Sequence, residues 1–255
     1  MSTAQPNRFE DFFADDAYVQ LKNLLYNYLL RKGAVNRSLR GLERGPVLEV
    51  GSGLSPMVTD CDRVTYTELS FAALRTLKEN QRRGHFVVAD ALHLPFRREA
   101  FAQAVCSEVL EHLADDRTAL AEMAGLLRPG GSLILTVPHR QAYFTIDDRF
   151  VHHLRRYELA GLDQMLRESG LIPREIRKVL GPLEKLLMMT ATAILTGRPS
   201  RREPRQRETS RDTGAALGRF LFKWFNRLLL GVVWIDAKLT PRFLSAVLLI
   251  RSVKK

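Results

Sequence analysis

The spacing of apolar and polar residues along the chain predicts strands that alternate with helices. Apolar residues recur at helical spacing after a capping Ser70, over residues 115–127 and over residues 155–170. Between these segments lie short apolar runs of strand length, which are PVLEV, VTYTELS, HFVVAD, FAQAVC, SLILTVPH and LIPREIRKVL. Strands separated by helices predict an α/β fold with a parallel sheet that is covered on both faces.

The N-terminal residues 1–45 are predicted to form a helical extension of this domain. Asp15 or Asp16 is a suitable N-cap, and Gly33 a suitable end. The apolar positions of the expected helix are Tyr18, Leu21, Leu25, Tyr28 and Leu29. We expect this helix to pack beside the domain or to cover its ligand site.

The strand and helix alternation defines a core domain over residues 46–180 and breaks down over residues 181–242. In the second range, two apolar segments flank the arginine-rich stretch RPSRREPRQRETSRD. Its charged composition predicts a mobile loop. Residues 243–255 then form a strongly apolar final strand. The pattern predicts a helical, basic insertion placed before the last strand of the sheet.

A glycine turn follows the first predicted strand, in the sequence VLEVGSG. Gly51 and Gly53 would let the backbone turn sharply and approach a ligand closely. Glu68 ends the next strand, 17 positions after Gly51. This is near the spacing of about 20 residues at which an acid binds the ribose of a nucleotide.

The residues around this turn argue against a dinucleotide and for S-adenosylmethionine. Pro56 stands where a dinucleotide fingerprint has its third glycine, and with Ser55 as N-cap it predicts the start of a short helix. Glu49 would repel a pyrophosphate but would suit a ligand that carries an ammonium and a sulfonium. Asp90 closes the third strand, where it could read an adenine amino group.

Five segments in register resemble the class I S-adenosylmethionine-dependent methyltransferases. They are VLEVGSG, TELS, VVADALHLPF, EVLEHL and LLRPGGSLILTVPH, and they look most like the broad bacterial group that modifies small molecules, lipids and glycans. The resemblance covers residues 46 to about 172 and resumes at the last strand. It implies a Rossmann-like, seven-stranded, mostly parallel sheet with S-adenosylmethionine as cofactor. The cofactor-binding residues that it implies are Glu49, Gly51, Ser52, Gly53, Glu68, Leu69, Asp90, Ala91 and Glu108.

The segment HHLRRY, residues 152–157, follows the fifth predicted strand. We expect it to face the acceptor of the methyl group. His153, His139 and Tyr157 are the candidate catalytic residues, because a histidine could serve as general base for an oxygen or nitrogen nucleophile. Arg156 could bind a phosphate or a carboxylate. The alternative is that the histidines and Tyr157 pack the loop while the arginines face water.

Composition limits the partners more than it identifies them. The net charge of +11 favours an anionic partner, which could be a nucleic acid, a membrane surface or a phosphorylated substrate. Cys61 and Cys106 lack any metal-ligand spacing, so we expect reduced thiols and assign no metal. The polar N-terminus is unlike a signal peptide, and no apolar run reaches about 20 residues, so we expect a cytoplasmic protein.

Residues 217–235 predict a basic amphipathic helix. Arg219, Lys223 and Arg227 recur every four positions, among aromatic and aliphatic residues. Such a helix could lie on the inner, anionic face of a membrane, or it could form a lid over the acceptor.

The preferred function is methyl transfer to a small-molecule or lipid- or glycan-linked acceptor. An RNA methyltransferase is the first alternative, although no RNA-binding module is recognisable. A non-catalytic protein that only binds S-adenosylmethionine is the second. The acceptor atom and the oligomeric state stay open.

Overall fold

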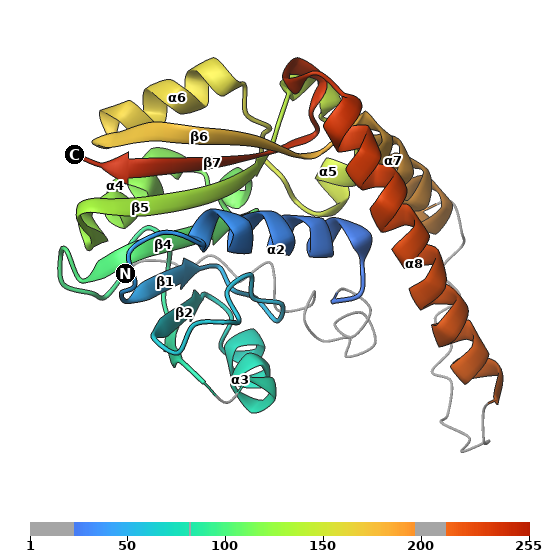
Figure 1. Ribbon diagram of the computed structural model, residues 1–255, viewed down its shortest axis with the longest axis horizontal. Helices are drawn as coiled ribbons and strands as arrows, with labels where there is room; N and C mark the ends of the chain where they lie inside the picture. Colours follow the sequence, from blue (N-terminus) through green and yellow to red (C-terminus); the bar gives the residue numbers. More distant parts are fainter. Residues whose placement is uncertain (1–22, 82, 197–212) are drawn as a thin grey trace, which may run out of the picture.

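A seven-stranded sheet with the strand order β3-β2-β1-β4-β5-β7-β6 forms the centre of the fold (Figure 1). The computed structural model describes residues 23–81, 83–196 and 213–255. Neighbouring strands pair in parallel from β3 to β5, whereas β7 runs antiparallel to both β5 and β6. The strands are β1 (Val47–Val50), β2 (Val64–Glu68), β3 (His85–Val88), β4 (Phe101–Ser107), β5 (Leu127–Pro138), β6 (Leu171–Leu180) and β7 (Val247–Lys254). The predicted Rossmann-like, mostly parallel sheet is confirmed.

Helices cover both faces of the sheet, so the central strands are buried on both sides. On β5, Leu133 and Leu135 belong to one apolar cluster, while Ile134 between them belongs to the other. This alternation follows from the two-residue period of a strand. The helices are α2 (Tyr26–Leu39), α3 (Phe71–Asn80), α4 (Asp116–Leu126), α5 (Ile146–Phe150), α6 (Leu159–Glu168), α7 (Pro182–Thr196) and α8 (Thr213–Leu239).

The N-terminal helix extends further than the sequence predicts. α2 continues past Gly33 to Leu39, because Val35 is fully buried in the cluster beneath it. Burying such a side chain is worth about 1.5–3 kcal/mol, which exceeds the helical penalty of about 1 kcal/mol for a glycine. The predicted caps Asp15 and Asp16 lie outside the described residues.

The prediction of a helix starting at Pro56 is wrong. Residues 51–63 form turns and bends, and side chains satisfy their backbone groups instead of helical hydrogen bonds. The Glu49 carboxylate accepts from the backbone N–H groups of Met57 and Val58 at 2.7 and 3.0 Å. The Tyr28 hydroxyl donates to the carbonyl of Pro56 at 2.8 Å. A second boundary also shifts, since residues 128–131 lie within β5 rather than ending α4.

Two helices, α7 and α8, occupy the segment between β6 and β7. α8 contacts α2 and β6, and α7 contacts α5. In Figure 1, α8 runs along one side of the protein beside α7. The arginine-rich stretch between α7 and α8 lies outside the described residues. None of the described helices has both the length and the apolar composition that crossing a bilayer requires.

A buried ion pair attaches α7 to the segment that follows β5. Lys185 Nζ donates to both carboxylate oxygens of Asp147 at 2.7 Å and to Asp148 Oδ2 at 2.5 Å. All three side chains are less than a tenth exposed. This contact fixes the first turn of α7 relative to the core.

Lys185→Met should therefore destabilise the protein strongly. The change leaves two buried carboxylates without their shared cation, which costs about 3–5 kcal/mol. Urea unfolding followed by circular dichroism measures this loss. The matched control is Lys223→Met on the exposed surface of α8, which should change stability by less than about 0.5 kcal/mol. Equal losses in the two variants would contradict the structural role of Lys185.

Candidate functional site

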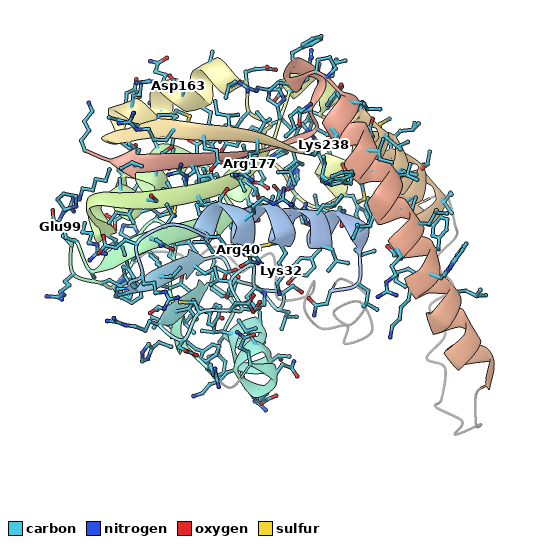
Figure 2. The ribbon with its side chains drawn as sticks, viewed as in Figure 1. Lys32, Arg40, Glu99, Asp163, Arg177 and Lys238 are labelled. Carbon is cyan, nitrogen blue, oxygen red and sulfur yellow. The ribbon has the colours of Figure 1, made fainter. Side chains whose placement is uncertain are left out.

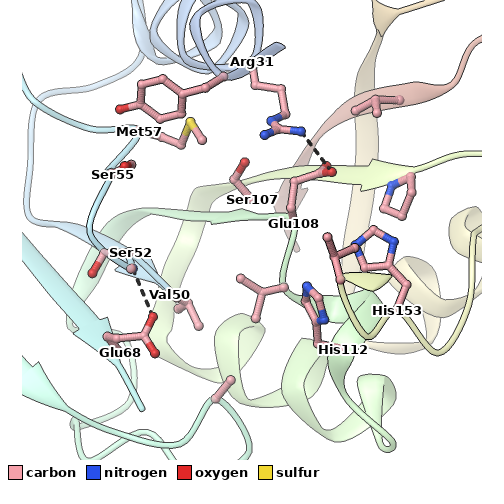
Figure 3. Close-up of a pocket in the computed structure, with 18 of the residues that line it drawn as sticks. Arg31, Val50, Ser52, Ser55, Met57, Glu68, Ser107, Glu108, His112 and His153 are labelled. Carbon is pink, nitrogen blue, oxygen red and sulfur yellow. Dashed lines mark hydrogen bonds and ion pairs between the residues drawn. The ribbon is translucent and has the colours of Figure 1, made fainter. Parts of the chain in front are cut away.

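A cavity of about 330 Å³ opens at the carboxyl ends of β1, β2, β4 and β5 (Figure 3). The strand order reverses between β1 and β4, and ligands of open α/β sheets bind at such a reversal. Its walls include the loop after β1, the ends of β2 and β4, part of α2 and the segment after β5. Residues far apart in sequence therefore share one site.

The turn after β1 depends on glycine for its backbone geometry. Gly51 has φ of +71°, and a Cβ added there would lie 2.4 Å from Cγ2 of Val109. The N–H groups of Gly51 and Ser52 both donate to the carbonyl of Thr67, at 2.9 and 3.0 Å. The backbone can thus pass close under the cavity, as the sequence predicts.

Glu68 joins this turn to the start of α3. Its Oε2 accepts from the N–H of Gly53 at 3.0 Å, and its Oε1 accepts from the N–H of Ser70 at 3.1 Å. Each carboxylate oxygen retains a further lone pair, which a hydroxyl donor in the cavity could use. Leu69 also lines the cavity, and this residue is 49% exposed.

Asp90 and Ala91 lie on the same wall, beyond the end of β3. Asp90 Oδ1 accepts from the N–H of Leu92 at 2.9 Å, which fixes the carboxylate beside the cavity. All nine residues predicted to bind the cofactor line the cavity.

Glu49 lines the cavity, but both of its carboxyl oxygens accept hydrogen bonds from backbone N–H groups. It is 3% exposed, and its two oxygens hold Met57 and Val58. Its principal role in this geometry is to shape the loop between β1 and β2.

Glu108 occupies the middle of the site in a left-handed backbone conformation, with φ of +55°. Such a conformation is uncommon outside glycine and tends to occur at functional sites. Arg31 of α2 pairs with Glu108 Oε2 at 3.3 Å, and the Thr136 hydroxyl donates to Oε1 at 3.1 Å (Figure 3). α2 thus contributes a cation to a site built on the sheet.

The segment after β5 forms the opposite end of the cavity, and Asp148 organises it. His153 Nδ1 and Arg156 Nε each lie 2.8 Å from Asp148 Oδ1, and Lys185 reaches Oδ2. Burial alone would raise the pKa of Asp148, but these three cationic or donating partners hold it well below its usual range. His153 and Arg156 line the cavity.

The structure does not bring His139 and Tyr157 into this cavity. His139 Nδ1 lies 2.8 Å from the carbonyl of Ser245, and burial lowers the pKa of the imidazole. The Tyr157 hydroxyl donates to Asp116 Oδ2 at 2.8 Å, and burial together with this carboxylate raises the pKa of the phenol. Both side chains pack the base of the loop, so the geometry offers no support for a catalytic role.

Several residues of the site were not predicted from sequence. Arg31, Asp148 and Lys185 come from three separate segments, and no local pattern connects them. Glu111 lies in the EVLEHL segment that resembles the methyltransferases, but the sequence assigns it no function. It is fully buried, and burial raises the pKa of its carboxyl well above the usual range.

Comparison with known proteins relates this site to methyltransferase domains. Residues 48–135 match the family described as a methyltransferase domain. The malonyl-[acyl-carrier protein] O-methyltransferase of Salmonella typhimurium is 30% identical over 122 residues, which are 44% of this chain and 49% of that protein. An uncharacterised methyltransferase of Bacillus subtilis is 29% identical over 119 residues, 43% of this chain and 47% of that protein. This chain thus covers about half the length of these relatives.

Solved structures share the fold over nearly the whole chain. One is a chain from the complex between the Trm112 methyltransferase activator of Haloferax volcanii and a methyltransferase, with a TM-score of 0.64 and 15% identity over 98% of this chain and 99% of that one. Another is an S-adenosylmethionine-dependent methyltransferase of Thermotoga maritima, with a TM-score of 0.62 and 18% identity over 97% and 98% of the two chains. At these identities the likeness establishes the fold.

The buried Glu49 carboxyl predicts a pH dependence of stability. Burial raises its pKa from 4.5 to about 7, against the opposing effects of the Met57 and Val58 N–H groups and of Lys32. Between these two values the folded protein holds a proton that the unfolded chain has lost, so stability should fall as pH rises through this window.

Urea unfolding of the native protein and of Glu49→Gln tests this sign. The stability of the native protein relative to the variant should fall by about 2–3 kcal/mol between about pH 5 and about pH 8. A difference that stays constant, or that grows with pH, would show that the Glu49 carboxyl is not protonated in the folded state.

Proposed function

Because the chain carries a class I S-adenosylmethionine-dependent methyltransferase domain over residues 48–135, we propose that it transfers a methyl group from this cofactor to a small-molecule or lipid- or glycan-linked acceptor. The observation that carries the proposal is that the glycine turn, Glu68 and Asp90 line one wall of a single cavity, at the carboxyl ends of β1, β2 and β3. The residues over 46–180 are proposed as the catalytic core, with residues 1–45 and 181–242 as additions to it and residues 243–255 as its last strand.

The residues of this wall fit the chemistry of S-adenosylmethionine. Glu68 can accept hydrogen bonds from the two ribose hydroxyls, and Asp90 can accept from the adenine amino group. The hydroxyls of Ser52 and Ser55 are buried at the cavity and have no partner among the described residues. Buried hydroxyls need partners, and the carboxylate and ammonium of the methionine end would supply them.

The bound cofactor supplies an electrophilic methyl group on a sulfonium. Glu108 places a carboxylate in the middle of the cavity, where it would favour a positively charged ligand. The protein then needs chiefly to align the acceptor with the methyl group and to exclude water. Arg31 and α2 close the site from above the sheet, which supports this excluding role.

The acceptor is proposed to enter at the end of the cavity formed by the segment after β5. His153, Arg156 and Val151 line this end, and Met188 of α7 borders it. The two hydrogen bonds that Asp148 receives from His153 and Arg156 hold these side chains in place. We assign His153 to the acceptor rather than to the cofactor.

Glu68→Ala should weaken binding of S-adenosylmethionine by about 1–3 kcal/mol, the cost of leaving buried hydroxyls without an acceptor. Isothermal titration calorimetry measures this change. Glu79→Ala, on the exposed surface of α3, is the control and should bind as the native protein does. Unchanged affinity in a folded Glu68→Ala protein would contradict this cofactor placement.

A second proposal concerns the exposed face of α8, which we infer rests on an anionic membrane surface. Large apolar side chains lie exposed along the helix at positions three and four residues apart, namely Leu221, Trp224, Phe225, Leu228, Val232, Ile235 and Leu239. Figure 2 shows α8 along one side of the protein, with Lys238 near its upper end. Arg219 of the predicted basic stripe lies outside the residues whose side chains are described.

Charge favours a lipid surface as the occupant of this face. Lys223, Arg227 and Lys238 are exposed beside the apolar row. The acid of α8, Asp236, is engaged by the Leu183 N–H and the Thr240 hydroxyl. Cations beside aromatic and aliphatic residues are typical of helices that lie in a membrane interface. A lipid-linked acceptor would be reached from such a position.

Flotation with anionic phospholipid vesicles tests this contact. The native protein should float at low salt and be released as salt rises, because each cation near the surface adds about 1 kcal/mol. Replacing Lys223, Arg227 and Lys238 together by Glu should abolish flotation. The same change at Arg75, Lys78 and Arg83, which are exposed near α3, should weaken it much less.

Two results would contradict the membrane proposal. One is a native protein that stays in the unbound fraction at low salt. The other is an equal effect of the two triple replacements. A protein partner would then be the better candidate for this face, since the Haloferax volcanii neighbour was solved in a complex with the Trm112 activator.

A further inference from the structure

Glu111 presents a buried carboxyl group to which no other described residue donates a hydrogen bond. It lies in the short helical turn Leu110–His112 after β4, and its side chain is fully buried. Neither of its oxygens has a hydrogen-bond partner within the part of the chain that the structure describes. Ionising a buried carboxyl group that accepts no side-chain hydrogen bond is costly, so this position calls for a cation or a donor.

Two histidines accompany this carboxylate. His112 is the next residue, and His153 reaches the same place from the segment after β5. Figure 3 shows the two rings beside each other at the cavity. The centroids of the two rings are 4.8 Å apart. One ligand atom from each of Glu111, His112 and His153 can be chosen so that all three lie within 4.8 Å of one another.

The distance between His153 and Glu111 suits two ligands of one ion better than a hydrogen bond. His153 Nε2 lies 3.7 Å from Glu111 Oε1, beyond hydrogen-bonding range. Two ligand atoms at about 2.0–2.2 Å from a tetrahedral zinc ion are about 3.3–3.6 Å apart. The three side chains would need to draw together by about 1 Å, which rotamer adjustments at a cavity wall can provide.

The outer nitrogens of both imidazoles already have oxygen partners. His153 Nδ1 lies 2.8 Å from Asp148 Oδ1, and His112 Nδ1 lies 3.3 Å from the carbonyl of His152. A carboxylate or carbonyl on one ring nitrogen directs the other toward a metal, as in most histidine metal sites. Asp148 in turn accepts hydrogen bonds from Arg156 and Lys185, which hold the carboxylate beside His153.

We propose that Glu111, His112 and His153 bind a divalent first-row transition metal ion, with zinc as the preferred occupant. Imidazole ligands favour such ions over magnesium and calcium. Three protein ligands with one side open to a cavity are the arrangement of catalytic rather than structural zinc sites. The sequence pattern assigned no metal, because 41 positions separate His112 from His153.

The role of this ion, though not its binding, rests on the methyl transfer proposed above. His112 and His153 line the cavity together with Glu108, so the open side of the ion faces the acceptor end. An acceptor that carries a hydroxyl, phenol or carboxylate oxygen would occupy this open position. The ion would hold that oxygen in place for transfer, which favours an O-methyl product.

Metal binding is measured on the whole chain, residues 1–255, without cofactor or acceptor. The protein is dialysed against a chelator and then titrated with Zn²⁺ by calorimetry, and with Co²⁺ by visible absorption. We expect one ion per chain. Glu111→Gln and His112→Ala should each weaken binding at least about tenfold, since even outer-shell changes cost 10–100-fold. His85→Ala removes an exposed imidazole from β3 and should bind as the native protein does.

The outcomes separate this proposal from the proposed function. Absence of Zn²⁺ binding, or equal affinity in the native protein, Glu111→Gln and His112→Ala, overturns the metal site. Circular dichroism in chelator checks that each variant is folded, and the partly exposed His112→Ala carries the test if Glu111→Gln unfolds. Binding of S-adenosylmethionine is measured separately, by calorimetry in the presence of chelator. A protein that binds Zn²⁺ but not S-adenosylmethionine would overturn only the cofactor assignment.

Discussion

The backbone of the loop between β1 and β2 is held by two carboxylates, and the cavity depends on that arrangement. A parallel pair of strands needs a crossover, which is usually a helix whose backbone groups satisfy one another. Here residues 51–63 contain no described helix. Glu49 and Glu68 accept four of the N–H groups around this loop instead, those of Met57, Val58, Gly53 and Ser70. Without them the loop would lose its shape and the cavity one wall.

At the acceptor end of the cavity, the Asp148 carboxylate holds the surrounding side chains in place. It receives donors from His153, Arg156 and Lys185, which belong to the segment after β5 and to α7. The insertion is therefore coupled to the site through a buried charge cluster rather than through apolar contact alone. A shift of α7 would disturb His153 directly, so whatever binds the exposed face of α8 can influence the acceptor end through the packing of α7 against α8.

Short-range patterns predicted the sheet and brought together the residues that line one wall of the cavity, because both depend on local sequence. Strand periodicity, the glycine turn and the acid at the end of β2 each act within a few residues of their position. The prediction of a helix starting at Pro56 is wrong because tertiary hydrogen bonds with Tyr28 and Glu49 take the backbone groups that a helix would use. His139 and Tyr157 were placed at the right end of the sheet, but their side-chain directions depend on Ser245 and Asp116. Those contacts span about a hundred and about forty positions, and no local pattern encodes them.

S-adenosylmethionine is proposed to bind in the cavity at the carboxyl ends of β1, β2 and β4, with its ribose on Glu68. A crystal structure of the protein with S-adenosylhomocysteine, the demethylated product, would show the position of the ribose. We expect both ribose hydroxyls within about 3 Å of the Glu68 carboxylate. We also expect the adenine beside Asp90 and the sulfur directed toward Glu108. A ligand bound elsewhere, or bound with its ribose away from Glu68, would contradict it.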